Sequence, residues 1–324
     1  MAAASYQHGL LGFGVLYAVG CGVIAALGFY HVTQSAAIRA ATDTPDHAVV
    51  WLTILGAFAS PVFLPLTAAL VNGVGWRGTL RVLAAIAAAV FLPMAALTRG
   101  RHLDAHSHHD VPTGVPAALR EAWQVPGVRR WVVASLISGA AVDIILVYQV
   151  PVMIAAGLPL GAAATIGGLR GLAQLGGRIP LSPLLHRLGT RRTIVLSLIA
   201  GAVGTVLLLA SGHVGPAIIY SLLAGASIGA MYTLQGIYTN ELVGQANLSL
   251  LMGAQAAVFA VGGAAGPVLA GTVFAATGSY VSVVVLTAAA LVASAVLMSA
   301  PGSPGRGLPR VREHAAQRLG HQAR

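Results

Sequence analysis

The chain alternates long apolar stretches with short polar ones. A helix needs about 20 consecutive apolar residues to cross a bilayer, because its backbone polar groups can pair only within the segment. Nine stretches are long enough, and they predict spans at residues 9–30, 48–72, 80–98, 131–156, 160–181, 192–211, 215–239, 248–274 and 279–300. The pattern therefore predicts an all-α, polytopic membrane protein with about nine transmembrane helices.

The arginines between these spans predict the orientation of the chain, because positive residues gather on the cytoplasmic side of a membrane protein. When alternate loops are counted, fifteen of the 18 arginines fall on one side, two on the other, and Arg170 falls within a span. The fifteen are Arg39, Arg99, Arg101, Arg120, Arg129, Arg130, Arg178, Arg187, Arg191, Arg192, Arg306, Arg310, Arg312, Arg318 and Arg324. We predict a multi-pass protein of the cell membrane with a cytoplasmic C-terminus.

A polar interruption divides the predicted helices into three and six. We predict a partial N-terminal bundle of three helices at residues 1–98, a cytoplasmic linker at 99–130, a C-terminal six-helix bundle at 131–300 and a basic cytoplasmic tail at 301–324. The tail begins with several Pro and Gly residues, so we expect it to be disordered or to lie on anionic headgroups.

Composition narrows the possible functions. Hydrophobic residues make up 57% of the chain and charged residues 8%, against about 25% charged in a soluble protein. The formal net charge is +10, but the arginines are spread over loops and not along the basic face that nucleic-acid binding needs. We therefore expect the lipid bilayer, and no nucleic acid, as a partner.

Several features argue against an enzyme. The chain has no lysine, which excludes a P-loop lysine and a Schiff base, and Cys21 is its only cysteine. The G-x-S-x-G pattern at residues 225–229 resembles a nucleophile elbow, but it lies inside a predicted helix and not at a strand-to-helix turn. The histidine-rich stretch at 102–110 could bind a divalent metal, but a flexible linker makes a poor preformed site, so we favour a solvated loop. We expect no enzymatic activity, no cofactor and no metal.

The segment at residues 177–193, GRIPLSPLLHRLGTRRT, resembles the signature loop of the major facilitator superfamily, G-x-L-x-D-R-x-G-R-R. Four of its residues match the pattern: Arg187, Gly189, Arg191 and Arg192. Arg178 stands at its start, and Ser182 and His186 replace the usual glycine and aspartate. We refer to residues 177–193 as the signature segment.

Two further stretches are similar to this family in the expected order. Residues 56–82 resemble its fifth and sixth helices, and residues 253–280 resemble its eleventh helix with the turn that follows. The resemblance implies twelve helices in two halves, with both termini cytoplasmic. Nine spans with a cytoplasmic C-terminus put the N-terminus outside, so we expect a chain truncated by three N-terminal helices, or a degenerate gene product.

Charges inside membrane spans are costly and usually mark function. Asp143 and Arg170 lie near the middle of adjacent predicted helices, so an ion pair is possible. In one interpretation Arg170 binds an anionic group while Asp143 takes up a proton or tunes Arg170; in the other the pair merely neutralises itself in the bundle. Gln174 lies one turn after Arg170 on the same face, and Gln149 offers a comparable polar side chain.

In the seventh predicted helix polar and aromatic residues fall near one face, which suits a cavity wall or helix packing alike: Tyr220, Ser227, Met231 and Tyr238.

The resemblance also suggests a substrate class. Monocarboxylate porters of the superfamily carry a substrate-binding arginine in the helix that corresponds to residues 160–181, and Arg170 looks similar. The acidic residue that this group has one turn earlier is here Ile166. We predict a secondary transporter of a small solute, with a carboxylate or another organic anion as the lead, working by alternating access with proton coupling. The alternative is a non-transporting remnant or scaffold. The sequence indicates no oligomeric state.

Overall fold

The computed structural model describes residues 3–7, 9–28, 55–56, 58–98, 120, 122–243 and 248–300. In these ranges the chain forms helices joined by short turns. In chain order the elements are η1 (Ala3–Tyr6), α1 (Leu10–Gly28), α4 (Ala59–Thr98), α6 (Pro126–Ala155), α7 (Leu160–Gly176), α8 (Leu181–Leu188), α9 (Thr190–Leu207), η2 (Leu208–Ala210), α10 (Val214–Val243), α11 (Leu248–Thr277) and α12 (Tyr280–Ser299). These ranges contain no strand, which confirms the all-α fold. The histidine-rich stretch, most of the predicted linker and the tail at 301–324 lie outside the described residues.

The chain forms two compact units. The first unit contains residues 1–111, 147–180 and 203–229, and the second contains residues 112–146, 181–202 and 230–324. Helices α6, α9 and α10 contribute to both, whereas α7 belongs wholly to the first unit and α11 and α12 wholly to the second. The predicted boundaries after residues 98, 130 and 300 stay predictions.

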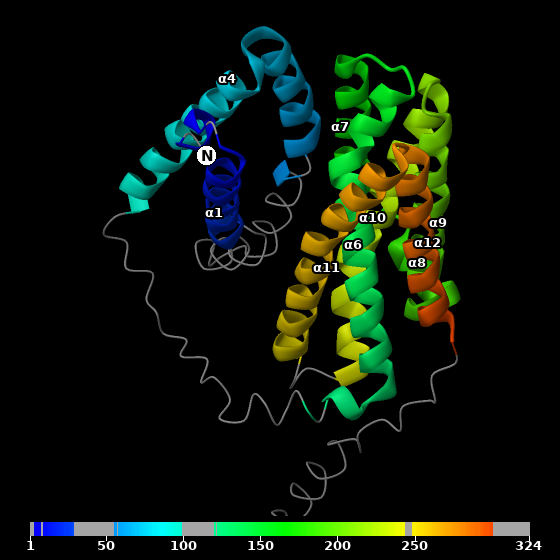
Figure 1. Ribbon diagram of the computed structural model, residues 1–324. Coiled ribbons are helices and arrows are strands. Elements are labelled where there is room, and N and C mark those ends of the chain that lie inside the picture. Colours follow the sequence, from blue (N-terminus) through cyan, green and yellow to red (C-terminus); the bar gives the residue numbers. More distant parts are fainter. Residues whose placement is uncertain are drawn as a thin grey trace, which may run out of the picture. The chain divides into compact units, whose positions relative to one another are not determined.

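Helix α4 bends sharply at Gly75, as Figure 1 shows. Gly75 has φ 70° and ψ 172°, a backbone conformation that is essentially restricted to glycine. The bend separates two apolar arms and lies between the predicted spans at 48–72 and 80–98. Arg77 and Arg81, just beyond the bend, donate to the carbonyl oxygen of Gln7 (3.2 Å) and the hydroxyl of Ser5 (3.1 Å).

Six helices in the described ranges have the length and apolar character to cross a membrane: Ala59–Pro93, Gly127–Ala155, Thr190–Ala210, Val214–Val243, Leu250–Thr277 and Tyr280–Ser299. This finding confirms a polytopic membrane protein, although the sequence predicted nine spans. Two of the differences have a structural reason: the arms that correspond to the spans at 48–72 and 80–98 meet at the kink at Gly75 and are counted together, and α7 ends at Gly176 and not at residue 181. Of the first predicted span, the structure describes side chains only up to Val23.

Glycines allow the backbones of α7 and α10 to touch within the first unit. A Cβ atom at Gly225 would overlap the carbonyl oxygen of Arg170, and one at Gly229 would overlap the carbonyl oxygen of Gln174. Small residues at helix contacts are the usual way to bring membrane helices close together. The backbone around Arg170 is thus held directly against α10.

We expect Gly229→Ala to destabilise the protein by about 1–3 kcal/mol, because a methyl group forced into a packed contact has about that cost. Thermal unfolding in detergent measures the change. The matched control is Gly236→Ala on the same helix, where a Cβ would lie 3.7 Å from the Cε of Met252, an ordinary packing distance. The control should be neutral or slightly stabilising, since alanine favours helix more than glycine does. An equal loss of stability in both variants would contradict this account.

Candidate functional site

Three buried polar side chains meet within the first unit. Gln149 on α6 accepts two hydrogen bonds at its Oε1 atom, from the Nε of Arg170 on α7 at 3.1 Å and from the hydroxyl of Tyr220 on α10 at 2.9 Å. Their exposed fractions are 2% for Gln149, 3% for Arg170 and 0% for Tyr220. We call these three residues the arginine cluster.

Neighbouring residues hold the arginine cluster in place. The hydroxyl of Ser221, next to Tyr220, donates to the carbonyl oxygen of Ile166 at 2.6 Å and so fixes α10 to α7. Gly167, one turn before Arg170, leaves room for the amide of Gln149, which a Cβ there would touch at 3.4 Å. The cluster therefore rests on close helix packing as well as on its own hydrogen bonds.

Burial makes these hydrogen bonds energetically important. A guanidinium removed from water is costly unless it is hydrogen-bonded, and bonds to a charged group contribute about 1.5–3 kcal/mol each. The bond from Arg170 to Gln149 is of this kind, and it is formed in surroundings that strengthen electrostatic interactions. An arrangement of one cation and one hydroxyl around a single acceptor oxygen is chemically suited to holding an anion.

Two further predicted site residues, Gln174 and Asp143, lie on the helices that carry Arg170 and Gln149. Gln174 is half-buried one turn beyond Arg170 on α7. Asp143 is half-buried on α6 and belongs to the second unit. Its carboxylate lies against Gly263 of α11, where a Cβ atom would collide with the carboxylate oxygen. The predicted ion pair between Asp143 and Arg170 therefore stays a prediction.

Tyr220 is the member of the cluster that the sequence did not single out. It stood only among several polar and aromatic residues near one face of its helix. Its position level with Arg170 depends on how α7 and α10 pack, and the glycines at 225 and 229 were the one signal in the sequence for that packing.

The signature segment proves to be partly helical. Helix α8 occupies Leu181–Leu188, and His186 and Arg187 lie exposed in its last turn, while Arg178 is half-buried before it. Gly189 then turns the chain with φ 76°, a left-handed conformation that favours glycine, and α9 begins at Thr190. The sequence predicted a loop between the spans at 160–181 and 192–211, whereas residues 181–188 form a helix.

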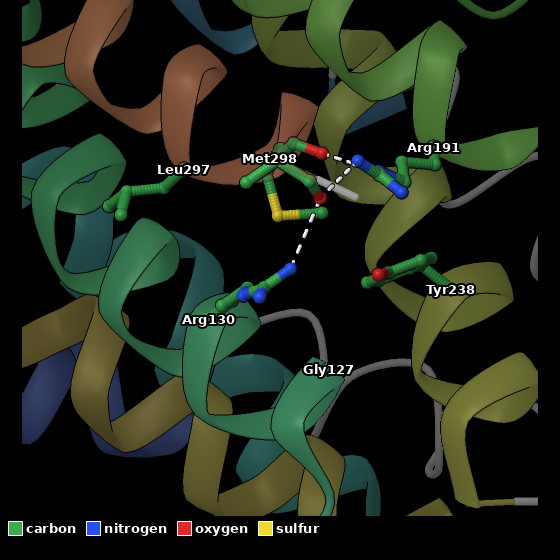
Figure 2. Close-up of a pocket in the computed structure, with 7 residues that line it drawn as sticks. Gly127, Arg130, Arg191, Tyr238, Leu297 and Met298 are labelled. Carbon is green, nitrogen blue, oxygen red and sulfur yellow. Dashed lines mark hydrogen bonds between the residues drawn. The ribbon is translucent and has the colours of Figure 1, made fainter. Parts of the chain in front are cut away.

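Arg191 binds the end of α12 within the second unit. Its guanidinium donates to the carbonyl oxygens of Met298, Ser299 and Ala300, and Arg130 of α6 also donates to Ala300, at 3.1 Å. Figure 2 shows both arginines pointing at this end of the helix. The last carbonyls of a helix lack partners within it and carry partial negative charge, so cations there are stabilising.

A small pocket opens beside these two arginines. Its lining residues are Gly127, Arg130, Arg191, Tyr238, Leu297, Met298 and Ala300. Nearby, the hydroxyl of Thr190 donates to Glu241, and the indole of Trp131 donates to Thr239 at 3.1 Å. The described contacts of Arg191 thus tie α9 to α12, and they assign this residue a structural role.

No cluster of three potential metal ligands occurs among the described residues. Six of the described helices have the length and apolar character to span a membrane, as in a polytopic membrane protein, and two of them, α6 and α10, contribute Gln149 and Tyr220 to the arginine cluster. The family model that describes the Major Facilitator Superfamily matches residues 153–320 of this sequence. Because the match covers just over half of the chain, the chain belongs to this family. A search of the curated proteins finds no match.

Family membership establishes the coarse function. The protein is a membrane transporter of the major facilitator type, a multi-pass protein that sits in a lipid bilayer and handles small-molecule solutes, and members of this family are generally transporters and not enzymes. The resemblance noted for the signature segment is thereby confirmed at the level of the superfamily. The likeness to monocarboxylate porters and the absence of three N-terminal helices stay predictions.

We expect Arg191→Ala to destabilise the protein by about 2 kcal/mol, because the carbonyl oxygens at the end of α12 lose a charged donor. Thermal unfolding in detergent measures the loss. Arg192→Ala removes the exposed neighbouring arginine and should change stability by less than about 0.5 kcal/mol. If the two variants unfold at the same temperature, Arg191 does not hold α12.

Proposed function

We propose that the protein is a secondary active transporter of a small organic anion, a carboxylate above all, and that Arg170 binds the anionic group. The observation that carries the proposal is the arginine cluster, in which a buried guanidinium and a hydroxyl from different helices converge on one oxygen. Charged residues within membrane helices usually mark a substrate or ion pathway. Transport follows alternating access, the mechanism of transporters built from repeated halves, whose solute sites lie near the middle of the bilayer.

Asp143 is proposed as the residue that couples transport to protons. A carboxylate within an apolar helix can gain and lose a proton, and its neutral form is the cheaper one in hydrocarbon. The lack of a side chain at Gly263 gives the Asp143 carboxylate its space against α11. Protonation there would change how α6 packs on α11, which is one way to link proton uptake to a helix movement.

The second candidate is a member of this transporter family that has lost transport and remains as a truncated remnant or scaffold. The direct backbone contacts of α7 with α10 favour it, because helices packed this closely also suit a static scaffold. In that case the arginine cluster only satisfies the polar groups of three helices. Transport assays separate the two functions.

In liposomes that contain the protein, we expect uptake of radiolabelled small carboxylates, and we expect Arg170→Gln to reduce it at least tenfold. The reason is that a lost charge-assisted contact is worth about 1.5–3 kcal/mol. Thr165→Ala on the same helix is the matched control, since this side chain is exposed. Uptake that is unchanged in Arg170→Gln would refute the role of Arg170, and no uptake by any variant would favour the scaffold.

We expect Asp143→Asn to abolish accumulation driven by an inward proton gradient while exchange of labelled for unlabelled solute continues. An amide cannot take up the proton, but the anion site is left intact. Both rates are measured in the same liposomes. Glu241→Gln is the control, because it removes a different carboxylate, exposed and bonded to Thr190. Loss of gradient-driven accumulation in both variants, or in neither, would show that Asp143 is not the coupling residue.

A further inference from the structure

The Oε1 atom of Gln149 occupies an unusual place in the arginine cluster. It is a neutral amide oxygen, yet it accepts from a guanidinium at 3.1 Å and from a phenol hydroxyl at 2.9 Å, and all three side chains are buried. A carboxylate oxygen in this place would make the bond from the tyrosine hydroxyl charge-assisted, which roughly doubles its strength, and would turn the bond from the guanidinium into an ion pair. The two donors would therefore hold a carboxylate oxygen more strongly than they hold the amide oxygen of Gln149.

The position of Gln149 follows from its packing. Its amide lies over Gly167 of α7, and Gly167 and Arg170 share a face of that helix because they are three residues apart. The glutamine thus approaches Arg170 along the surface of α7, and its oxygen ends between the two donors. A glutamine side chain has three rotatable bonds, and rotation about them is what would carry its amide away from the two donors.

We propose that the amide oxygen of Gln149 holds the place of one carboxylate oxygen of the transported solute. On binding, the Gln149 side chain turns away, and the solute oxygen accepts from the Nε of Arg170 and the hydroxyl of Tyr220. Gln149 and Tyr220 are then specificity-determining residues, and the site selects a carboxylate over its neutral amide. This inference rests on the proposed function of Arg170.

The competing explanation is that Gln149 only joins α6 to α7 and α10. The two explanations differ for Gln149→Glu. This change places a carboxylate of nearly the same shape between the same donors, so the helices are joined more strongly in either case. If the solute carboxylate binds where the Gln149 oxygen lies, the glutamate carboxylate also blocks solute binding. If Gln149 only joins the helices, solute binding is unchanged.

Binding and stability are measured on the purified chain in lipid nanodiscs. The probes are acetate, butyrate and benzoate, each paired with its neutral amide. We expect the protein to bind at least one acid and not the corresponding amide, and Arg170→Gln to lose that binding. Gln149→Glu should melt at a higher temperature and bind the acid at least tenfold more weakly. Tyr220→Phe, which removes one donor, should weaken binding of the acid about tenfold and leave the amide unaffected.

Gln255→Glu is the control for stability. The exposed fraction of Gln255 is 2%, the same as that of Gln149. Its described contact is with the hydroxyl of Ser135 at 3.2 Å and not with an arginine, so the change to glutamate should lower the melting temperature. Acid binding by Gln149→Glu and Tyr220→Phe at the unmodified affinity would overturn this inference and leave the role of Arg170 standing. No acid binding by the unmodified protein, or binding that survives in Arg170→Gln, would overturn the proposed function and this inference with it.

Discussion

A guanidinium inside an apolar helix bundle must find its hydrogen-bond partners among the helices, because hydrocarbon offers none. Arg170 meets this requirement through Gln149, whose oxygen also accepts from Tyr220. One buried charge thereby fixes the relative positions of α6, α7 and α10. The glycine contact between Gly225 and the carbonyl oxygen of Arg170 serves the same end, since it brings α10 close enough to α7 for the tyrosine to reach the cluster.

The same physical requirement governs the ends of the helices. The last carbonyl groups of α12 have no partners in their own helix, and Arg191 supplies donors to three of them. Gly189 makes this possible because its left-handed backbone ends α8 and starts α9 one residue before Arg191. The signature segment therefore works here as a structural tie between helices, with His186 exposed where the family usually has an aspartate.

The sequence predicted the helices well where apolar length alone decides them. The last predicted span, at residues 279–300, differs by one residue at each end from α12 (Tyr280–Ser299). It was wrong about the end of α7, because the leucines of α8 continue the apolar pattern past Gly176, although Gly177, Arg178 and Pro180 mark the turn between these helices. Length and composition also predicted separate spans at 48–72 and 80–98, and the kink at Gly75 divides α4 into two arms at the corresponding place.

The candidate site was only partly predictable. Arg170 stood out because a charge in an apolar stretch is rare, and Gln149 was noted for its polarity. Their contact could not be deduced, because the neighbours of a helix depend on packing across distant parts of the chain. Charge alone made an ion pair of Arg170 with Asp143 possible, and that pair stays a prediction; the hydrogen bond of Arg170 to a neutral amide is the contact that charge did not indicate. Tyr220 was missed as a site residue for the same reason.

The central claim is that the arginine cluster receives the carboxylate of the solute. A crystal structure of the protein in a lipid phase with a brominated carboxylate tests it most directly, since anomalous scattering locates the bromine independently of any assumed site. The account predicts a carboxylate oxygen within hydrogen-bonding distance of the Arg170 Nε and the Tyr220 hydroxyl, with the amide of Gln149 displaced. A ligand bound elsewhere, with the hydrogen bonds among Arg170, Gln149 and Tyr220 intact, would contradict it.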